Sequence, residues 1–176
     1  MIMRPTTPSE IDAVMRILSD GRASIAALGI DQWQGGYPFR STVEEDVAAG
    51  KSYVVESESG ALLATAMVDF DGDAIYDNIE GAWLTSSTSE NPAYACVHRV
   101  AVAAESKGKG AAKFLLAEAC AAAKRAGLES VRIDTHPGNV PMRSLLDACG
   151  FKLCGVIRIA YAGEDTPERV AYEKRL

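Results

Sequence analysis

Apolar residues recur at helical spacing near the start of the chain. After a short extended start, residues 8–25 carry apolar side chains three and four positions apart, which predicts a helix. Residues 29–40 are interrupted by glycines and a proline and predict a loop. A short acidic helix is expected next, capped by Ser41 or Thr42 and ended by Gly50.

Apolar and β-branched runs separated by turn residues dominate the rest of the chain. They predict strands over residues 52–56, 62–70, 75–84, 93–102, 130–134, 151–161 and 169–175. Two further helices are expected at 110–126, which is rich in alanine, and at 139–149. Hairpins combined with a strand–helix–strand crossover predict a single α/β domain over residues 1–176, with a mixed sheet covered by helices on both faces.

Composition narrows the possible partners. With 18 basic and 24 acidic residues the net charge is −6, which disfavours a nucleic-acid surface. The four cysteines form no Cys-x-x-Cys pair and there are only two histidines, so no metal site is expected. Neither a secretory signal nor an apolar run of membrane-spanning length is visible, and the expected location is cytoplasmic.

The segment from residue 97 to 112 carries the clearest chemical signal. A strand leads into a glycine-bearing turn and then into a helix, whose unpaired backbone amides favour an anion such as phosphate. Lys107 and Lys109 add positive charge. The spacing excludes a kinase-type phosphate loop, and Lys113 stands where a dinucleotide fingerprint needs its third glycine. A plain strand-to-helix turn with solvated lysines is the alternative.

Three motifs in order resemble the GNAT N-acetyltransferase superfamily. Lys107-x-x-Gly110-x-Ala112 resembles its coenzyme A motif, although Arg or Gln is usual at the first position. The segment 134–139 resembles the next strand and its asparagine, and Gly150-Phe151 resembles the end of the last helix. The resemblance implies a GNAT fold: α/β (α+β type), with a mixed, mostly antiparallel central sheet of about six to seven strands and helices on both faces.

The same resemblance implies how acetyl-CoA is held. The pyrophosphate is assigned to Lys107, Gly108, Lys109, Gly110, Ala111 and Ala112. The pantetheine arm is assigned to the backbone of Val100, Ala101 and Val102, with Asn139 and Met142 on its other side. The implied reaction is direct acetyl transfer to a primary amine, and the acceptor is a small molecule or a peptide. A homodimer is possible in this family.

An ammonium acceptor must lose a proton before it attacks, and imidazole suits that task at neutral pH. His98 is the candidate base, directly or through water, because strand alternation places it on the face of Val100 and Val102 unless a bulge intervenes. A half-buried structural histidine is the alternative, and His136 is interpreted as a turn residue. The family's general-acid tyrosine is replaced by Leu146, so Tyr161 or water is left for that role.

Aromatic residues on polar loops indicate where the acceptor binds. Trp33 and Tyr37 lie in a glycine-rich loop and are interpreted as pocket walls in preference to core residues. Trp83 is either an opposing wall or core. Two other functions stay open: a non-catalytic acyl-CoA sensor, suggested by Leu146 and Lys107, and an interaction module that uses the aromatic loop and binds no coenzyme A.

Overall fold

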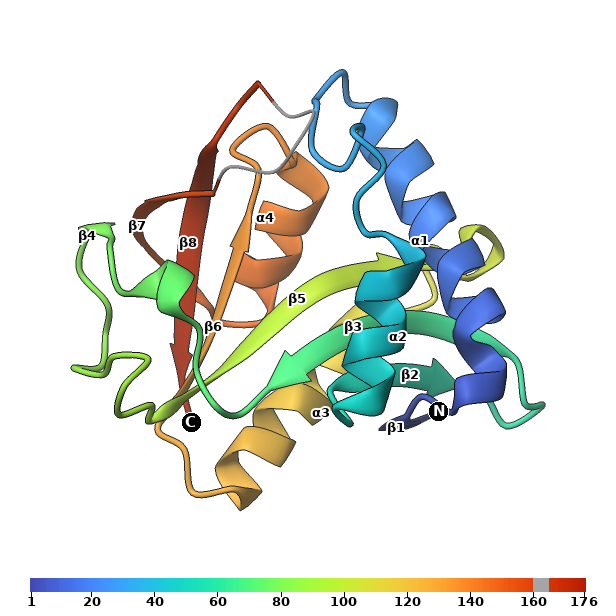
Figure 1. Ribbon diagram of the computed structural model, residues 1–176, viewed down its shortest axis with the longest axis horizontal. Coiled ribbons are helices and arrows are strands. Elements are labelled where there is room, and N and C mark those ends of the chain that lie inside the picture. Colours follow the sequence, from blue (N-terminus) through green and yellow to red (C-terminus); the bar gives the residue numbers. More distant parts are fainter. Residues whose placement is uncertain (160–164) are drawn as a thin grey trace.

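The computed structural model describes residues 1–159 and 165–176 (Figure 1). Eight strands form one sheet in the order β1-β2-β3-β5-β6-β8-β7-β4, in which β5 and β6 run parallel and the other neighbours are antiparallel. The strands are β1 (Ile2–Pro5), β2 (Ser52–Glu56), β3 (Leu62–Asp69), β4 (Glu80–Gly81), β5 (Tyr94–Val102), β6 (Ser130–Thr135), β7 (Lys152–Arg158) and β8 (Glu168–Arg175).

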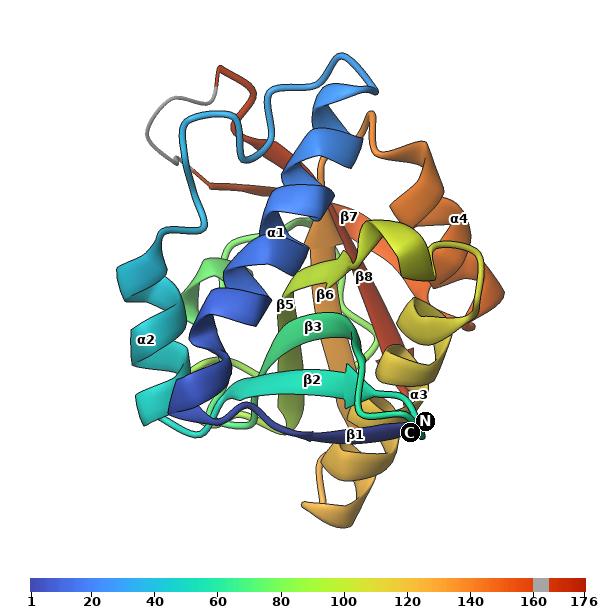
Figure 2. The same cartoon turned by 90° about the vertical axis from the view of Figure 1, so that its right-hand side faces the viewer.

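Helices cover both faces of this sheet, as Figure 2 shows. On one face lie α1 (Ile11–Ala26) and α2 (Arg40–Ala48), and on the other lie α3 (Ala111–Arg125) and α4 (Val140–Ala148). Apolar side chains of α3 and α4 pack on the sheet in one core cluster, and those of α1 and α2 pack in a second. None of the helices in the described part of the chain is long and apolar enough to cross a membrane.

The fold class predicted from the sequence is confirmed, with three corrections to individual elements. The sheet has eight strands because β1 and the two-residue β4 join its edges. The strand predicted over 75–84 is too long: only Glu80–Gly81 form a strand, β4, and Ala74–Tyr76 form a 3-10 helix, whose start is capped by the Asp73 side chain accepting the Ile75 N–H at 3.0 Å. Phe39, not Ser41 or Thr42, precedes α2. The last predicted hairpin includes Tyr161, which lies outside the described residues.

The two parallel strands separate half-way along the sheet. Residues 94–97 of β5 pair with residues 130–133 of β6, and beyond them the strands diverge (Figure 1). Residues Ala101 and Val102 still pair with β3 on the other side. Among the described residues, the divergence leaves the β6-facing edge of β5 without a neighbouring strand, between α1 and α4.

A β-bulge on β5 changes which side chains share a face. Arg99 has φ = 55°, and the pairing with β3 shifts register there. Before the bulge, Val97 packs against the α3 face; after it, Val100 and Val102 do so, while Ala101 packs against α1. The bulge is the exception allowed for in the prediction from strand alternation: it reverses the alternation, so His98 does not share a face with Val100 and Val102.

Candidate functional site

An open groove runs along the free edge of β5. It encloses about 900 Å³ including its mouth, and it is lined mainly by apolar side chains. Its walls come from α1, β5, the start of α3 and α4: Gly21, Ser24, Ile25, Leu28, Val100, Ala101, Val102, Lys107, Ala112, Asn139, Pro141, Met142 and Leu145. Gly21 lets α1 lie close to β5, because a Cβ there would stand 3.0 Å from the Cβ of Ala101.

The glycine turn between β5 and α3 has the geometry of an anion cradle. Gly108 and Gly110 have φ values of 75° and 83°, and a Cβ placed on either would meet no atom within 4 Å. These glycines therefore serve the left-handed backbone and leave the approach to the α3 amides open. Ala111 is buried in the core and can offer only its backbone.

The Lys107 side chain, which was predicted to bind phosphate, is hydrogen-bonded to α1 in this structure. Its Nζ donates a hydrogen bond to Ser24 Oγ at 2.5 Å, so the side chain links the turn to α1. Seven of the predicted cofactor residues line the groove itself: Val100, Ala101, Val102, Lys107, Ala112, Asn139 and Met142. The other four, Gly108 to Ala111, form the turn between Lys107 and Ala112.

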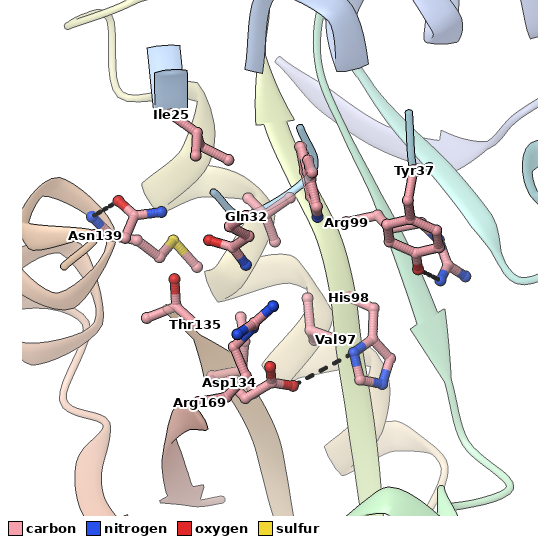
Figure 3. Close-up of a pocket in the computed structure, with 14 residues that line it drawn as sticks. Ile25, Gln32, Tyr37, Val97, His98, Arg99, Asp134, Thr135, Asn139 and Arg169 are labelled. Atoms are coloured by element: carbon pink, nitrogen blue, oxygen red, sulfur yellow. Dashed lines mark hydrogen bonds and ion pairs between the residues drawn. The ribbon is translucent and has the colours of Figure 1, made fainter. Parts of the chain in front are cut away.

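A second, more enclosed pocket opens where β5 and β6 diverge (Figure 3). It encloses about 550 Å³ including its mouth. Its lining residues are Ile25, Gln32, Trp33, Tyr37, Val97, His98, Arg99, Val100, Ile133, Asp134, Thr135, Asn139, Met142 and Arg169. The pocket and the groove share Ile25, Val100, Asn139 and Met142. The two spaces therefore meet at the bulge of β5.

His98 lies between two carboxylates at the base of this pocket. Its Nδ1 is 3.7 Å from Asp134 Oδ1, and its Nε2 is 3.2 Å from Asp73 Oδ2, an ion-pair contact and not an aligned hydrogen bond. The ring is stacked on Tyr76, with centroids 5.6 Å apart and an interplanar angle of 18°. The Tyr76 hydroxyl donates to Asp134 Oδ1 at 2.8 Å. Three residues, Asp73, Tyr76 and Asp134, thus fix the position of one imidazole ring.

The two carboxyl groups differ in electrostatic environment. Burial raises the pKa of Asp134 above its ordinary value, although His98 and the Tyr76 hydroxyl act in the opposite direction. Burial also acts to raise the pKa of Asp73, but His98 and the Ile75 N–H outweigh it, and the pKa lies below its ordinary value. A carboxyl group whose pKa is raised by burial therefore faces the pocket, and a carboxyl group whose pKa is lowered lies on the other side of His98.

The aromatic loop takes part in both the core and the pocket. Trp33 is buried in the core under α1 and lines the pocket at the same time. The Tyr37 hydroxyl accepts a hydrogen bond from Arg99 Nη1 at 2.7 Å, and Arg99 also holds Asp46 through two bonds of 2.7 and 2.9 Å. The loop, α2 and the bulge are therefore tied together by one guanidinium.

Trp83 does not form the opposing wall that was predicted as one of its two roles. Its indole N–H donates to the Tyr76 carbonyl at 2.9 Å, and its ring lies 4.3 Å from the guanidinium carbon of Arg132. It belongs to a core cluster with Tyr76 and Tyr94. The alternative interpretation of Trp83, a core residue, agrees with this position.

The other residues discussed from the sequence lie in a turn or in the core. His136 Nδ1 accepts the Gly138 N–H at 3.0 Å, as expected of a turn residue, and its Nε2 lies 3.4 Å from Asp31. Leu146 is fully buried in the core. Cys96 on β5, which has no role predicted from the sequence, is also fully buried, and burial raises the pKa of its thiol, which disfavours a thiolate nucleophile.

Sequence reasoning missed several residues of the pocket. Asp134 was named only as part of a family motif. A carboxylate at the end of a strand, next to the place where two strands diverge, is a feature that could have indicated a site residue. Gln32 is buried, and its Oε1 has no hydrogen-bond partner among the described residues. Arg169 and Asp73 reach the site only through tertiary structure, and no sequence spacing indicates them.

Comparison with known proteins agrees with this architecture. The sequence model of the acetyltransferase (GNAT) family matches residues 22–151. A GNAT-family acetyltransferase from Streptococcus agalactiae is 32% identical, with 99% of this chain and 95% of that chain covered and a TM-score of 0.80. A ribosomal-protein-alanine N-acetyltransferase from Brucella melitensis shares the fold at 17% identity, with both chains fully covered (100%) and a TM-score of 0.67. Among curated proteins none matches. The match over most of the chain shows that this protein belongs to the GNAT acetyltransferase family.

Proposed function

We propose that this protein is an N-acetyltransferase that moves an acetyl group from acetyl-CoA directly to a primary amine. The observation that carries the proposal is the junction of two spaces, an open groove and an enclosed pocket, at Ile25, Val100, Asn139 and Met142. Ligands that enter from the two sides would meet at the bulge of β5. When bound in the groove, acetyl-CoA supplies an activated acetyl thioester.

The groove fits an extended, phosphorylated ligand. Beyond Val97 this edge of β5 has no neighbouring strand in the part of the chain that the structure describes, so its backbone groups are available to pair with an amide-bearing chain in the way an added strand would. The glycine turn presents the N-terminus of α3, where amides and the helix dipole favour pyrophosphate. Apolar side chains of α1 and α4 cover the remainder.

The pocket fits the acceptor. An alkyl ammonium group has a pKa near ~10.4, so a group in the pocket must remove a proton before the nitrogen can attack. The cluster around His98, with Asp134 and Tyr76, supplies this acid–base function, and Trp33 and Tyr37 form walls. The limited volume favours a small amine or the end of a peptide as acceptor.

Replacing His98 by alanine is expected to lower turnover at neutral pH by about 100-fold, because the acid–base cluster loses its central member. Affinity for coenzyme A should change by less than about threefold, since the groove does not include His98. Steady-state kinetics and calorimetric titration of coenzyme A separate the two effects. Unchanged turnover would remove His98 from the mechanism.

A thiol-release assay with acetyl-CoA and a panel of amines tests the proposal as a whole. The panel should hold small amines, amino acids and peptides with a free amino terminus or a lysine. Release of thiol that depends on one class of amine supports the proposal and identifies the acceptor. Tight binding of acetyl-CoA without release on any amine would favour the alternative of a non-catalytic acyl-CoA sensor.

A further inference from the structure

Both nitrogens of the His98 ring lie near carboxylates. Nδ1 faces Asp134 across the divergence of β5 and β6, as Figure 3 shows, and Nε2 faces Asp73 on the other side. A general base must present a lone pair to the proton that it takes. A proton on Nδ1 beside Asp134 leaves the single lone pair of the neutral ring on Nε2, which is buried, so that lone pair is closed to an acceptor amine in the pocket.

Asp134 has the opening that His98 lacks. Its Oδ1 accepts the Tyr76 hydroxyl and faces His98, whereas no described residue donates a hydrogen bond to its Oδ2. The carboxyl group lines the pocket, and its side chain is only 8% exposed. It stands at the end of β6, directly across from the bulge where groove and pocket meet.

We propose that Asp134, through Oδ2, is the group that takes the proton from the acceptor's ammonium. His98 is then a positioning residue, which contacts the other carboxylate oxygen, Oδ1, and keeps the Asp134 side chain in place. This inference rests on the proposed function. The ammonium N–H bond breaks as an O–H bond forms on Asp134. The neutral amine then forms the new C–N bond while the thioester C–S bond breaks, and the second proton lost by the nitrogen passes to the departing sulfur, which leaves as the thiol. The proton on Asp134 leaves to water once the products have dissociated.

The surroundings of Asp134 determine how its titration responds to substitution. The titratable and charged groups that face it are His98 and Cys96 on β5, Tyr76 on the 3-10 helix, Asp73 before that helix, and Arg169 on β8. His98, Tyr76 and Arg169 lower the pKa of Asp134, whereas Asp73 raises it. Because the ionised form of Asp134 is the active one, kcat/KM should fall as the pH drops through this pKa.

The test is the pH profile of kcat/KM for three variants. Asp134→Asn should lower kcat/KM by about 100-fold or more and abolish the fall at acid pH. His98→Asn should keep that fall but move it to higher pH, because a group that favours ionised Asp134 is lost. Asp73→Asn should move it to lower pH, because a repelling carboxylate is lost.

The opposite pattern would overturn the inference. If His98 itself takes the proton, His98→Asn abolishes the acid limb and Asp134→Asn merely displaces it. A shift in these profiles is a readout that a purely structural role would not produce. The two substitutions that spare Asp134 give a decision even if Asp134→Asn fails to fold. A wild-type protein that acetylates no amine would overturn the proposed function as well, whereas an active wild type with the opposite pattern overturns only the role of Asp134.

Discussion

Replacing Gly110 by aspartate should weaken the binding of coenzyme A by at least about 100-fold, which corresponds to roughly 2.7 kcal/mol. The new carboxylate would stand at the N-terminus of α3, compete for the amides to which we assign the pyrophosphate, and repel that ligand. Strain at φ = 83° costs about 1 kcal/mol, and the favourable position of an anion at a helix N-terminus offsets part of that cost. The protein should therefore fold, and calorimetric titration measures the loss directly.

The same helix offers a matched control at its other end. Gly127 also has a left-handed backbone, with φ = 82°, and a Cβ there would meet no atom within 4 Å. Gly127→Asp introduces the same strain and the same charge far from the turn. Its affinity for coenzyme A should stay within about twofold of the wild-type value. Equal losses in the two variants would contradict the assignment of the turn.

Replacing Glu173 by glutamine should lower the free energy of unfolding by about 3–5 kcal/mol, because it leaves the fully buried Arg132 without its counter-charge. The carboxylate accepts hydrogen bonds from the Leu84 and Thr85 amides, from the Thr85 hydroxyl at 2.5 Å, and from Ser130 at 2.6 Å. An amide cannot replace all of these acceptors. Urea denaturation measures the difference.

The pH dependence of stability gives a second check on Glu173. Burial acts to raise its pKa, but bonds from Ser130 and Thr85 and the charge of Arg132 outweigh it, so the folded pKa lies below the ordinary value. The stabilisation is therefore present above about pH 4.3 and is lost as the pH falls through the folded value. Glu173→Gln should lack this part of the acid dependence.

Glu168 provides the control for this substitution. It lies on the same strand, and its ion pair with Arg158 at 2.6 Å is largely exposed. Glu168→Gln should change the unfolding free energy by less than about 1 kcal/mol. A loss from Glu173→Gln no larger than this would show that the buried network contributes little.

The elements that depend on local sequence were predicted well. The helix expected at 110–126 is α3 at Ala111–Arg125, because alanine-rich sequence and flanking glycines act locally. The strand expected at 93–102 is β5 at Tyr94–Val102. The glycine turn between them lies at the groove. Each of these features follows from residues close together in the chain.

The features that depend on tertiary contacts were not predictable in the same way. The bulge at Arg99 requires a positive φ at a residue that rarely adopts it, and contacts with Asp46 and Tyr37 hold it in place. Only Glu80–Gly81 of the strand expected over 75–84 form a strand, because Ala74–Tyr76 make a 3-10 helix that turns Tyr76 inward to bond Asp134. The acid–base cluster therefore depends on contacts between distant segments, which no spacing rule reveals.

The most direct test of direct acetyl transfer is a quenched single-turnover experiment with isotopically labelled acetyl-CoA and an accepted amine. Mass spectrometry of the amine and of the intact protein then locates the label. The account predicts label on the amine nitrogen and none on the protein, since Cys96 is buried and its thiol is held protonated. Label that first appears on the protein, or an amine that stays unlabelled while thiol is released, would contradict it.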